Sequence, residues 1–270
     1  MPTFKITLAY DGTQFVGWQR QASGTSIQGL LEDALRELDR RDVAVIGAGR
    51  TDAGVHALGQ VAGFSLERAI APDALVRAIN ARLPVAVRVL SAIDAPPTFH
   101  ARFGARTKIY RYRIWNGEVM SPFERTYAWH VPGRLAGEAM ITAARVFEGR
   151  HDFSAFEAAG GETLTTERVV FSSRIAAGLN PGATSVDDRG ASSQACDGRL
   201  IVYEIAGNGF LRHMVRNIVG TLVEIGCGRR PVEWVGEVLA SRDRAQAGPT
   251  APAEGLVLVG IEYEADARTV

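Results

Sequence analysis

Residues 47–57 combine side chains that can do chemistry with residues that let a backbone turn sharply. The stretch holds one carboxylate, Asp52, one guanidinium, Arg50, and one imidazole, His56, among three glycines. Apolar runs precede and follow it, which predicts a loop between two strands. Because glycine lets a backbone bend and approach a ligand closely, this composition suits a binding or catalytic site better than a core.

Other interpretations of the same loop stay open from composition alone. An aspartate in a glycine-rich turn commonly hydrogen-bonds its own backbone, and Arg50 could then be its ion-pair partner. The lysine and Ser/Thr of a P-loop and the third glycine of the dinucleotide fingerprint are missing. The five histidines form no HxxxH or HExxH pair, and Cys196 and Cys227 form no CxxC spacing, so we predict no metal site and no disulfide.

Length and charge limit the class of protein. With 270 residues and 46% hydrophobic content, the chain can bury a full core in one large or two small domains. Its 30 basic and 30 acidic residues give a formal net charge of zero, which argues against bulk attraction to nucleic acid. A polyanion would have to meet local clusters such as the five basic residues within 102–113. We expect a cytoplasmic protein, because we see neither a signal peptide nor a membrane-length apolar run.

The first part of the chain alternates strand and helix patterns. Phe4, Ile6 and Leu8 alternate with polar residues and predict a half-buried strand. Residues 26 to about 39 show helical spacing, with a capping box formed by Thr25 and Gln28. A helix opened by Pro72 and a strand at 85–90 follow, and the paired prolines within 94–98 mark a candidate boundary.

The second part contains two features that could bind a ligand or form core. In the predicted strand 107–115, Tyr110 and Tyr112 share one face and Arg111 and Arg113 the other, so the strand could stack a base and contact phosphates, or bury its aromatics as core. A predicted helix with an apolar stripe over 210–223 carries Arg216 on a different face. A helix at 135–147, a helix opened by Pro231, a hairpin of strands at 169–175 and 200–205, and a last strand at 256–262 complete the pattern.

These elements predict an α+β fold of two α/β subdomains, with a largely antiparallel mixed sheet, helices packed on it, and the active-site cleft between the halves. The N-terminal subdomain, residues 1–104, would carry the Asp52 loop. The C-terminal subdomain, residues 105–270, would carry the Tyr110 strand and the Arg216 helix. Between the hairpin strands, residues 176–198 are rich in Gly, Ser, Asp and Asn and predict a long excursion.

Six segments in order resemble the tRNA pseudouridine synthase A family, and the resemblance spans nearly the whole chain. They are residues 10–21, 49–57 (Gly-Arg-Thr-Asp-Ala-Gly-Val-His-Ala), 99–103 (Phe-His-Ala-Arg-Phe), 110–112, 214–220 (Met-Val-Arg-Asn-Ile-Val-Gly) and 253–256. The one departure is the 176–198 segment, which is longer than the hairpin turn usual in the family.

The resemblance implies isomerisation of uridine to pseudouridine at positions 38, 39 and 40 of the tRNA anticodon stem-loop. It also implies a homodimer that needs no cofactor and no metal. In this sequence, Asp52 corresponds to the nucleophile or essential carboxylate, Tyr110 to the aromatic that stacks on the target base and assists proton removal from C5, and Arg216 to the cation that pairs with Asp52. Substrate binding is implied for Arg50, which would help the base to flip out, for Leu256 as an apolar wall, and for His56 and Arg111.

The chemistry needs these residue types. The glycosidic bond must move from N1 to C5, so the base must first leave its stack, at a cost of a few kcal/mol. Tyr110 can replace the lost stacking and Arg50 can supply a cation near the vacated position. Asp52 can add to the sugar or the base, or take the 2′ proton on a glycal route. Two further hypotheses are a non-catalytic tRNA-binding module on the same scaffold and, more weakly, a metal-dependent nuclease that uses Asp52 and His56.

Overall fold

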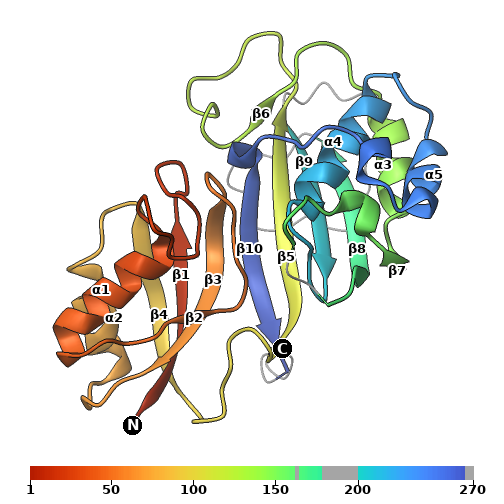
Figure 1. Ribbon diagram of the computed structural model, residues 1–270. Helices are drawn as coiled ribbons and strands as arrows, with labels where there is room; N and C mark the ends of the chain where they lie inside the picture. The colour runs from red at the N-terminus through yellow and green to blue at the C-terminus, as the bar shows by residue number, and fades with distance from the viewer. Residues whose placement is uncertain (162–163, 178–199, 265–270) are drawn as a thin grey trace. The chain divides into compact units, whose positions relative to one another are not determined.

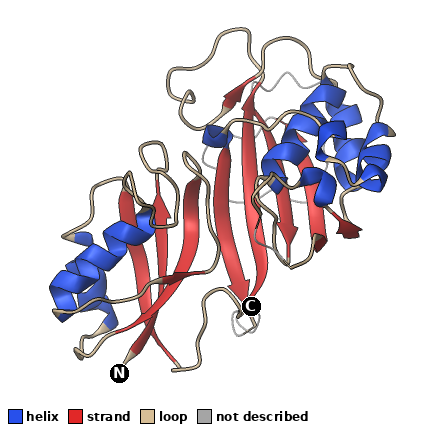
Figure 2. Cartoon of the chain, viewed as in Figure 1, coloured by secondary structure: helices blue, strands red, loops and turns tan. Residues whose placement is uncertain are grey.

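The computed structural model describes residues 1–161, 164–177 and 200–264. Contacts divide the chain into two compact units: Met1–Lys108 with Val257–Val270 form unit 1, and Ile109–Leu256 form unit 2. Each unit combines a largely antiparallel arrangement of strands with helices, so the predicted α+β class is confirmed (Figures 1 and 2). A division at residue 104 remains a prediction about domains; by contacts, the chain from residue 257 onward groups with unit 1. Nearly all of the predicted 176–198 excursion lies outside the described residues.

The sheet of unit 1 is organised around its first strand. That strand, β1 (Thr3–Tyr10), pairs antiparallel with β3 (His56–Ser65) and with β4 (Val87–Ala95). The last strand, β10 (Leu256–Tyr263), pairs parallel with β3, opposite the residues that follow the Asp52 loop. Phe4, Ile6 and Leu8 are fully buried, as their alternation predicts. The order is β4-β1-β3-β10, with β2 (Ile46–Gly47) paired to β3.

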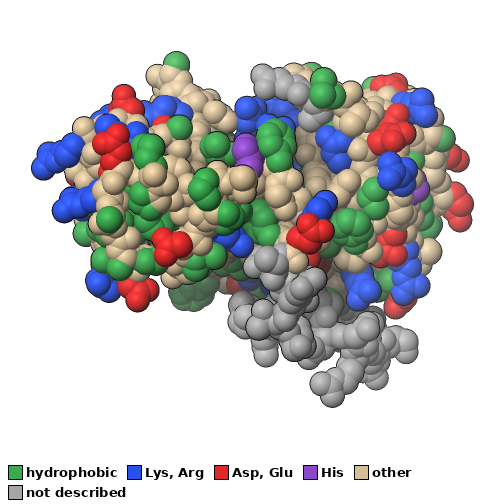
Figure 3. All heavy atoms as spheres, turned by 90° about the horizontal axis from the view of Figure 1, so that it is seen from below, with side chains coloured by type: hydrophobic (Ala, Val, Ile, Leu, Met, Phe, Trp, Pro, Cys, Tyr) green, Lys and Arg blue, Asp and Glu red, His purple; other side chains and the backbone are tan. Residues whose placement is uncertain are grey.

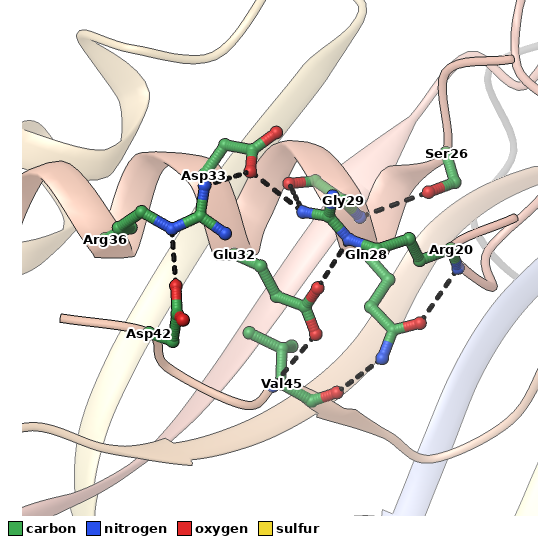
Figure 4. Close-up of polar contacts among 9 residues, drawn as sticks. All are labelled: Arg20, Ser26, Gln28, Gly29, Glu32, Asp33, Arg36, Asp42 and Val45. Atoms are coloured by element: carbon green, nitrogen blue, oxygen red, sulfur yellow. Dashed lines mark hydrogen bonds and ion pairs between the residues drawn. The ribbon is translucent and has the colours of Figure 1, made fainter. Parts of the chain in front are cut away.

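The helix α1 (Ile27–Asp39) begins one residue later than the predicted capping box requires. Ser26 is the N-cap, and its Oγ accepts a hydrogen bond from Gly29 N at 3.1 Å (Figure 4). The predicted Thr25–Gln28 capping box is therefore wrong. Gln28 instead ties the helix to its neighbours, because its amide donates to Val45 O and accepts from Arg20 N, both at 3.0 Å (Figure 4). The second helix of the unit, α2 (Pro72–Asn80), starts at the predicted proline and packs on β4.

Asp39 is the last residue of α1, and its side chain is only 1% exposed. Its carboxylate accepts from Arg41 Nε at 2.7 Å and from the backbone N–H groups of Glu67 and Arg68 at 3.0 and 2.9 Å. Burial acts to raise the pKa of this carboxyl, but these hydrogen bonds outweigh it and the pKa lies below its ordinary value.

We expect Asp39→Asn to destabilise the protein by about 1–3 kcal/mol at neutral pH, because an amide NH₂ would face donors that the carboxylate now satisfies. A depressed native pKa stabilises the fold above the unfolded-state pKa of about 3.9, and this contribution disappears as the pH falls through the native value. The gap between wild type and variant should therefore be large at pH 7 and shrink in strong acid, as measured by urea unfolding.

Asp42→Asn is the matched control, because the Asp42 carboxylate pairs with Arg36 at 2.6 Å but is 87% exposed (Figure 4). Exposed pairs contribute about 0–1 kcal/mol, so this variant should stay near the wild type at both pH values. A gap for Asp39→Asn that is equal at both pH values would contradict the assignment.

Unit 2 places its helices around a sheet of order β5-β9-β8-β7, with β6 paired to β5. The predicted hairpin strands, β8 and β9, pair antiparallel. Of the helix α4 (Met214–Gly226), only Arg216 and Glu224 are not buried, so burial extends beyond the predicted apolar stripe and includes the polar Asn217 and Thr221. The bounds are Ala105–Trp115 (β5), Trp129–His130 (β6), Gly149–Asp152 (β7), Glu167–Ala177 (β8), Leu200–Gly207 (β9), Gly137–Arg145 (α3), Met214–Gly226 (α4) and Trp234–Ser241 (α5), with short 3₁₀ turns at Ser154–Phe156, Arg244–Gln246 and Ala253–Gly255.

Charged side chains of both signs are interspersed on the face drawn in Figure 3, in keeping with a formal net charge of zero. No helix within the described residues has both the length and the apolar content needed to cross a membrane. Within the same residues, no group of three or more His, Cys, Asp or Glu side chains gathers as a metal site would require.

Candidate active site

The Asp52 loop leaves β2 at Gly47 and enters β3 at His56. Asp52 is half-buried and Arg50 is exposed. Just beyond Asp52 the chain turns, with Val55 N donating to Asp52 O at 3.1 Å and Gly54 at a φ of +78°. That positive φ is the conformation glycine adopts at little cost, so this glycine shapes the turn that follows the carboxylate.

Residues 10–18 hold the loop from one side. Trp18 N donates to Thr51 O at 3.0 Å, and Gly54 N donates to Phe15 O at 3.3 Å. A side-chain carbon at Gly17 would lie 2.5 Å from Thr51 O, and one at Gly12 would collide with Val55 O. Part of the 10–21 motif therefore brings one backbone against another, and only glycine permits that approach.

A buried group of hydroxyl and amide side chains also holds the loop in place. Tyr10 Oη lies 2.8 Å from Thr51 Oγ1, and Gln60 Nε2 donates to Gly49 O at 2.9 Å and to Tyr10 Oη at 3.5 Å. Burial raises the pKa of Tyr10 to about 12, although the hydrogen bonds with Thr51 and Gln60 oppose the shift. The phenol thus stays protonated at any physiological pH. These contacts fix the residues on both sides of Arg50.

His56 follows the loop at the start of β3 and is 6% exposed. Its Nδ1 accepts from Gly12 N at 3.0 Å and lies 3.2 Å from Asp11 Oδ1. These contacts join the loop to the turn after β1. Substrate binding by His56 stays a prediction.

We expect Gly17→Ala to lower kcat by roughly a hundredfold, because the methyl group would push Thr51, and Asp52 with it, out of place by about an ångström. The fold should persist, since the contact involves one loop. The rate of the isomerisation that the family resemblance implies and the circular dichroism spectrum are the measurements. Gly17 has a φ of +102°, and Gly133→Ala is the matched control because Gly133 has a φ of +84° but nothing lies within 4 Å of the added carbon. Equal losses in the two variants would show that backbone strain alone is responsible.

The predicted two-faced strand is present as β5. Tyr110 is 7% exposed and meets the Phe210 ring edge-on, with centroids 5.2 Å apart at 86°. Tyr112, two residues on, is fully buried, so that part of the aromatic face is core. On the other face, Arg111 donates to Glu204 Oε2 from Nε at 3.1 Å and from Nη2 at 2.8 Å. Arg111 therefore has a carboxylate partner within the protein.

Arg216 and Leu256 are linked through a short segment after α5. Arg216 Nε donates to Ala251 O at 2.7 Å, and Ala251 N donates back to Arg216 O at 3.1 Å. Farther along, Tyr112 Oη donates to Pro252 O at 2.7 Å, and a side-chain carbon at Gly255 would lie 2.5 Å from the Tyr112 ring. This packing places Leu256, which is 6% exposed, at the start of β10.

The structure thus brings the predicted residues together in two groups. Arg50 and Asp52 share one loop in unit 1, and His56 follows it at the start of β3. In unit 2, one segment links Arg216 and Leu256, and Tyr110 shares β5 with Arg111. Pairing between Asp52 and Arg216 stays a prediction. Sequence reasoning missed the supporting residues, although most of them lie inside or beside the motifs: Tyr10, Gly12, Gly17, Thr51, Gln60 and Asn217.

Comparison with known proteins gives a consistent result over nearly the whole chain. A family model described as tRNA pseudouridine synthase matches residues 6–104 and 143–264, ranges that include Asp52 and Arg216. Three relatives carry the name tRNA pseudouridine synthase A. They come from Myxococcus xanthus (44% identical over 263 residues, 97% of this chain and 92% of the relative), Moorella thermoacetica (43% over 265 residues, 97% and 100%) and Limosilactobacillus fermentum (42% over 272 residues, 100% and 99%).

These matches define the class of protein as an RNA-modifying isomerase. The chain belongs to the tRNA pseudouridine synthase family. The predicted family and the predicted isomerase activity are therefore confirmed.

Proposed function

We propose that this enzyme isomerises uridine to pseudouridine at positions 38, 39 and 40 of the tRNA anticodon stem-loop, with Asp52 as its essential carboxylate. One observation carries the role of Asp52: it sits half-buried on a loop that buried hydrogen bonds and close glycine contacts hold in place. The three tRNA positions are those that the family resemblance implies. A reaction that must keep hold of a detached base needs its carboxylate placed before the substrate arrives.

The reaction breaks the C1′–N1 bond and forms a C1′–C5 bond, while C5 loses a proton and N1 gains one. Asp52 serves this change either by bonding covalently to the sugar or the base, or by removing the 2′ proton on a glycal route. Both routes need a carboxylate beside the target nucleotide. The single carboxylate of the loop supports an isomerase, since most glycoside hydrolases use two carboxylates, one of them to deliver water.

The other roles follow from residue type and exposure. Arg50 is exposed on the loop, and we propose that its side chain enters the position that the flipped base leaves. Tyr110 stacks on that base and, as the phenolate, accepts the C5 proton. Leu256 forms an apolar wall, and Arg216 pairs with Asp52 in the complex with tRNA. His56 and Arg111 contact the tRNA substrate, and their hydrogen bonds with Gly12 and Glu204 hold them in place for this role. We also propose a cytoplasmic homodimer of subdomains divided near residue 104.

The test uses transcript tRNA labelled with tritium at C5 of uridine, since bond formation at C5 releases that label to water. Transcripts with uridine at positions 38, 39 and 40 should release tritium, and transcripts with cytidine at all three should release none. Release that persists from the cytidine transcripts would show that the target uridine lies elsewhere in the tRNA. No release from any transcript bearing uridine at these positions would overturn the proposed function.

A further inference from the structure

Residues 247–252 form a strap that lies directly against α4. A side-chain carbon at Gly220 of the helix would collide with Pro249 O, and one at Gly248 of the strap would lie 2.7 Å from Thr221 Cα. Thr221 Oγ1 also accepts from Gly248 N at 3.0 Å and donates to Asn217 O at 2.9 Å. The backbones of the strap and of α4 are therefore in direct contact here, so a shift of the strap must also shift the helix.

One arginine, Arg244, holds the strap through several hydrogen bonds. Arg244 Nη1 donates to Gly248 O at 2.9 Å and to Ala247 O at 3.4 Å. Its Nη2 donates to Thr250 Oγ1 at 3.1 Å and to Asn217 Oδ1 at 3.0 Å. All four acceptors are neutral, so this guanidinium acts in these contacts as a multidentate hydrogen-bond donor.

Asn217, a buried residue of α4, connects Arg244 to this helix. Its side chain is fully buried, with Nδ2 donating to Phe156 O at 2.7 Å and Oδ1 accepting from Thr250 Oγ1 at 2.6 Å as well as from Arg244. A buried amide satisfied at both ends fixes its surroundings, since loss of any partner would strand a polar atom.

The network ends on the chain neighbours of Arg216 and of its hydrogen-bond partner Ala251. Asn217 follows Arg216 in the helix, and Thr250 precedes Ala251, which accepts from Arg216 Nε and donates to Arg216 O. We propose that Arg244 is a positioning residue for uridine isomerisation, which aims the Arg216 guanidinium through Asn217, Thr250 and Ala251. This inference rests on the proposed role of Arg216.

Arg244→Met tests it by removing every donor while keeping an unbranched apolar side chain. We expect kcat to fall about 10- to 100-fold, the scale of a small misplacement of a catalytic group, with KM for tRNA changed less than about threefold. Arg229→Met is the matched control, because Arg229 pairs with Glu224 near the far end of α4 and is 65% exposed. It should keep the wild-type kcat. A wild-type kcat for Arg244→Met would overturn the inference.

A double-mutant cycle separates positioning of Arg216 from general support of the fold. If Arg244 acts through Arg216, Arg244→Met should lower kcat by less than about threefold in an Arg216→Lys background, because coupled residues are not additive. Full additivity would overturn the inference. If Arg244→Met does not fold, Thr250→Val replaces it in the cycle, with a several-fold loss of kcat expected and the same criterion of additivity.

The outcomes also separate this inference from the proposed function. If wild type releases no tritium from transcripts with uridine at 38, 39 and 40, or if Arg216→Lys keeps the wild-type kcat, then the proposed function or the proposed role of Arg216 fails, and the inference fails with it. If Arg216→Lys is slow and Arg244→Met is not, the inference alone fails.

Discussion

Asp52→Asn is expected to release tritium from C5-labelled tRNA at least about a thousandfold more slowly than the wild type, since an amide can neither add to the substrate nor accept its proton. The loop should keep its conformation, because Thr51, Gly49 and backbone groups make contacts with residues 10–18 and with Gln60 that the substitution leaves in place. Single-turnover kinetics measure the rate. Filter binding should give a Kd for tRNA within about threefold of the wild type, because neither form of residue 52 is a cation that binds phosphate.

Asp73→Asn makes the same chemical change on an exposed site in α2, also in unit 1, and should leave the rate unchanged. An Asp52→Asn enzyme that kept more than about a tenth of the wild-type rate would show that Asp52 neither forms a bond nor moves a proton in the slow step.

Tyr110→Phe should lower kcat by at least about a hundredfold if the Tyr110 phenolate accepts the C5 proton and becomes a phenol, since general bases contribute roughly 10²–10⁴ in rate. Tyr110→Ala should lose a further factor that corresponds to stacking, which contributes about 1–3 kcal/mol per base. The Phe ring would keep its edge contact with Phe210, so the fold of β5 should not change. Tritium release and tRNA binding, measured for both variants, separate proton transfer from stacking.

The result that would contradict the proton role is specific. If Tyr110→Phe kept nearly the full rate while Tyr110→Ala lost most of it, stacking alone would account for the residue. Phe210→Leu controls for the neighbouring ring, because it removes the edge contact without touching the phenol. Edge contacts contribute about 0.5–1.5 kcal/mol, so its effect on kcat should be small beside that of either Tyr110 variant.

Local pattern was sufficient to predict much of the fold. The alternation of Phe4, Ile6 and Leu8, the helical spacing that became α1, and the two hairpin strands all depend on neighbours in sequence. The error at the start of α1 shows the limit of such patterns. Thr25 and Ser26 can both cap a helix, and the choice depends on where the chain leaves Trp18, whose carbonyl accepts from Gln28 N at 2.9 Å.

The return of β10 to unit 1 could not be predicted from local pattern. Its register pairs Val257 with His56, across some two hundred residues of chain, and nothing in the sequence around either residue encodes the other. The same holds within the candidate site. Asp52 and Arg216 stand in recognisable motifs, whereas Gln60 and Arg244 gain their significance only from contacts with Gly49 and Asn217.

The parallel pairing of β3 with β10 also sets an order of events during synthesis. Unit 2 is continuous in sequence, from Ile109 to Leu256, and can fold while the ribosome is still making the segment that follows it. Until residues 257–263 emerge, the strand that carries His56 lacks its parallel neighbour and presents an open edge. The pairing of β3 directly after the Asp52 loop is therefore completed last, and a nascent chain that stops before β10 should hold a folded unit 2 while β3 still lacks this neighbour.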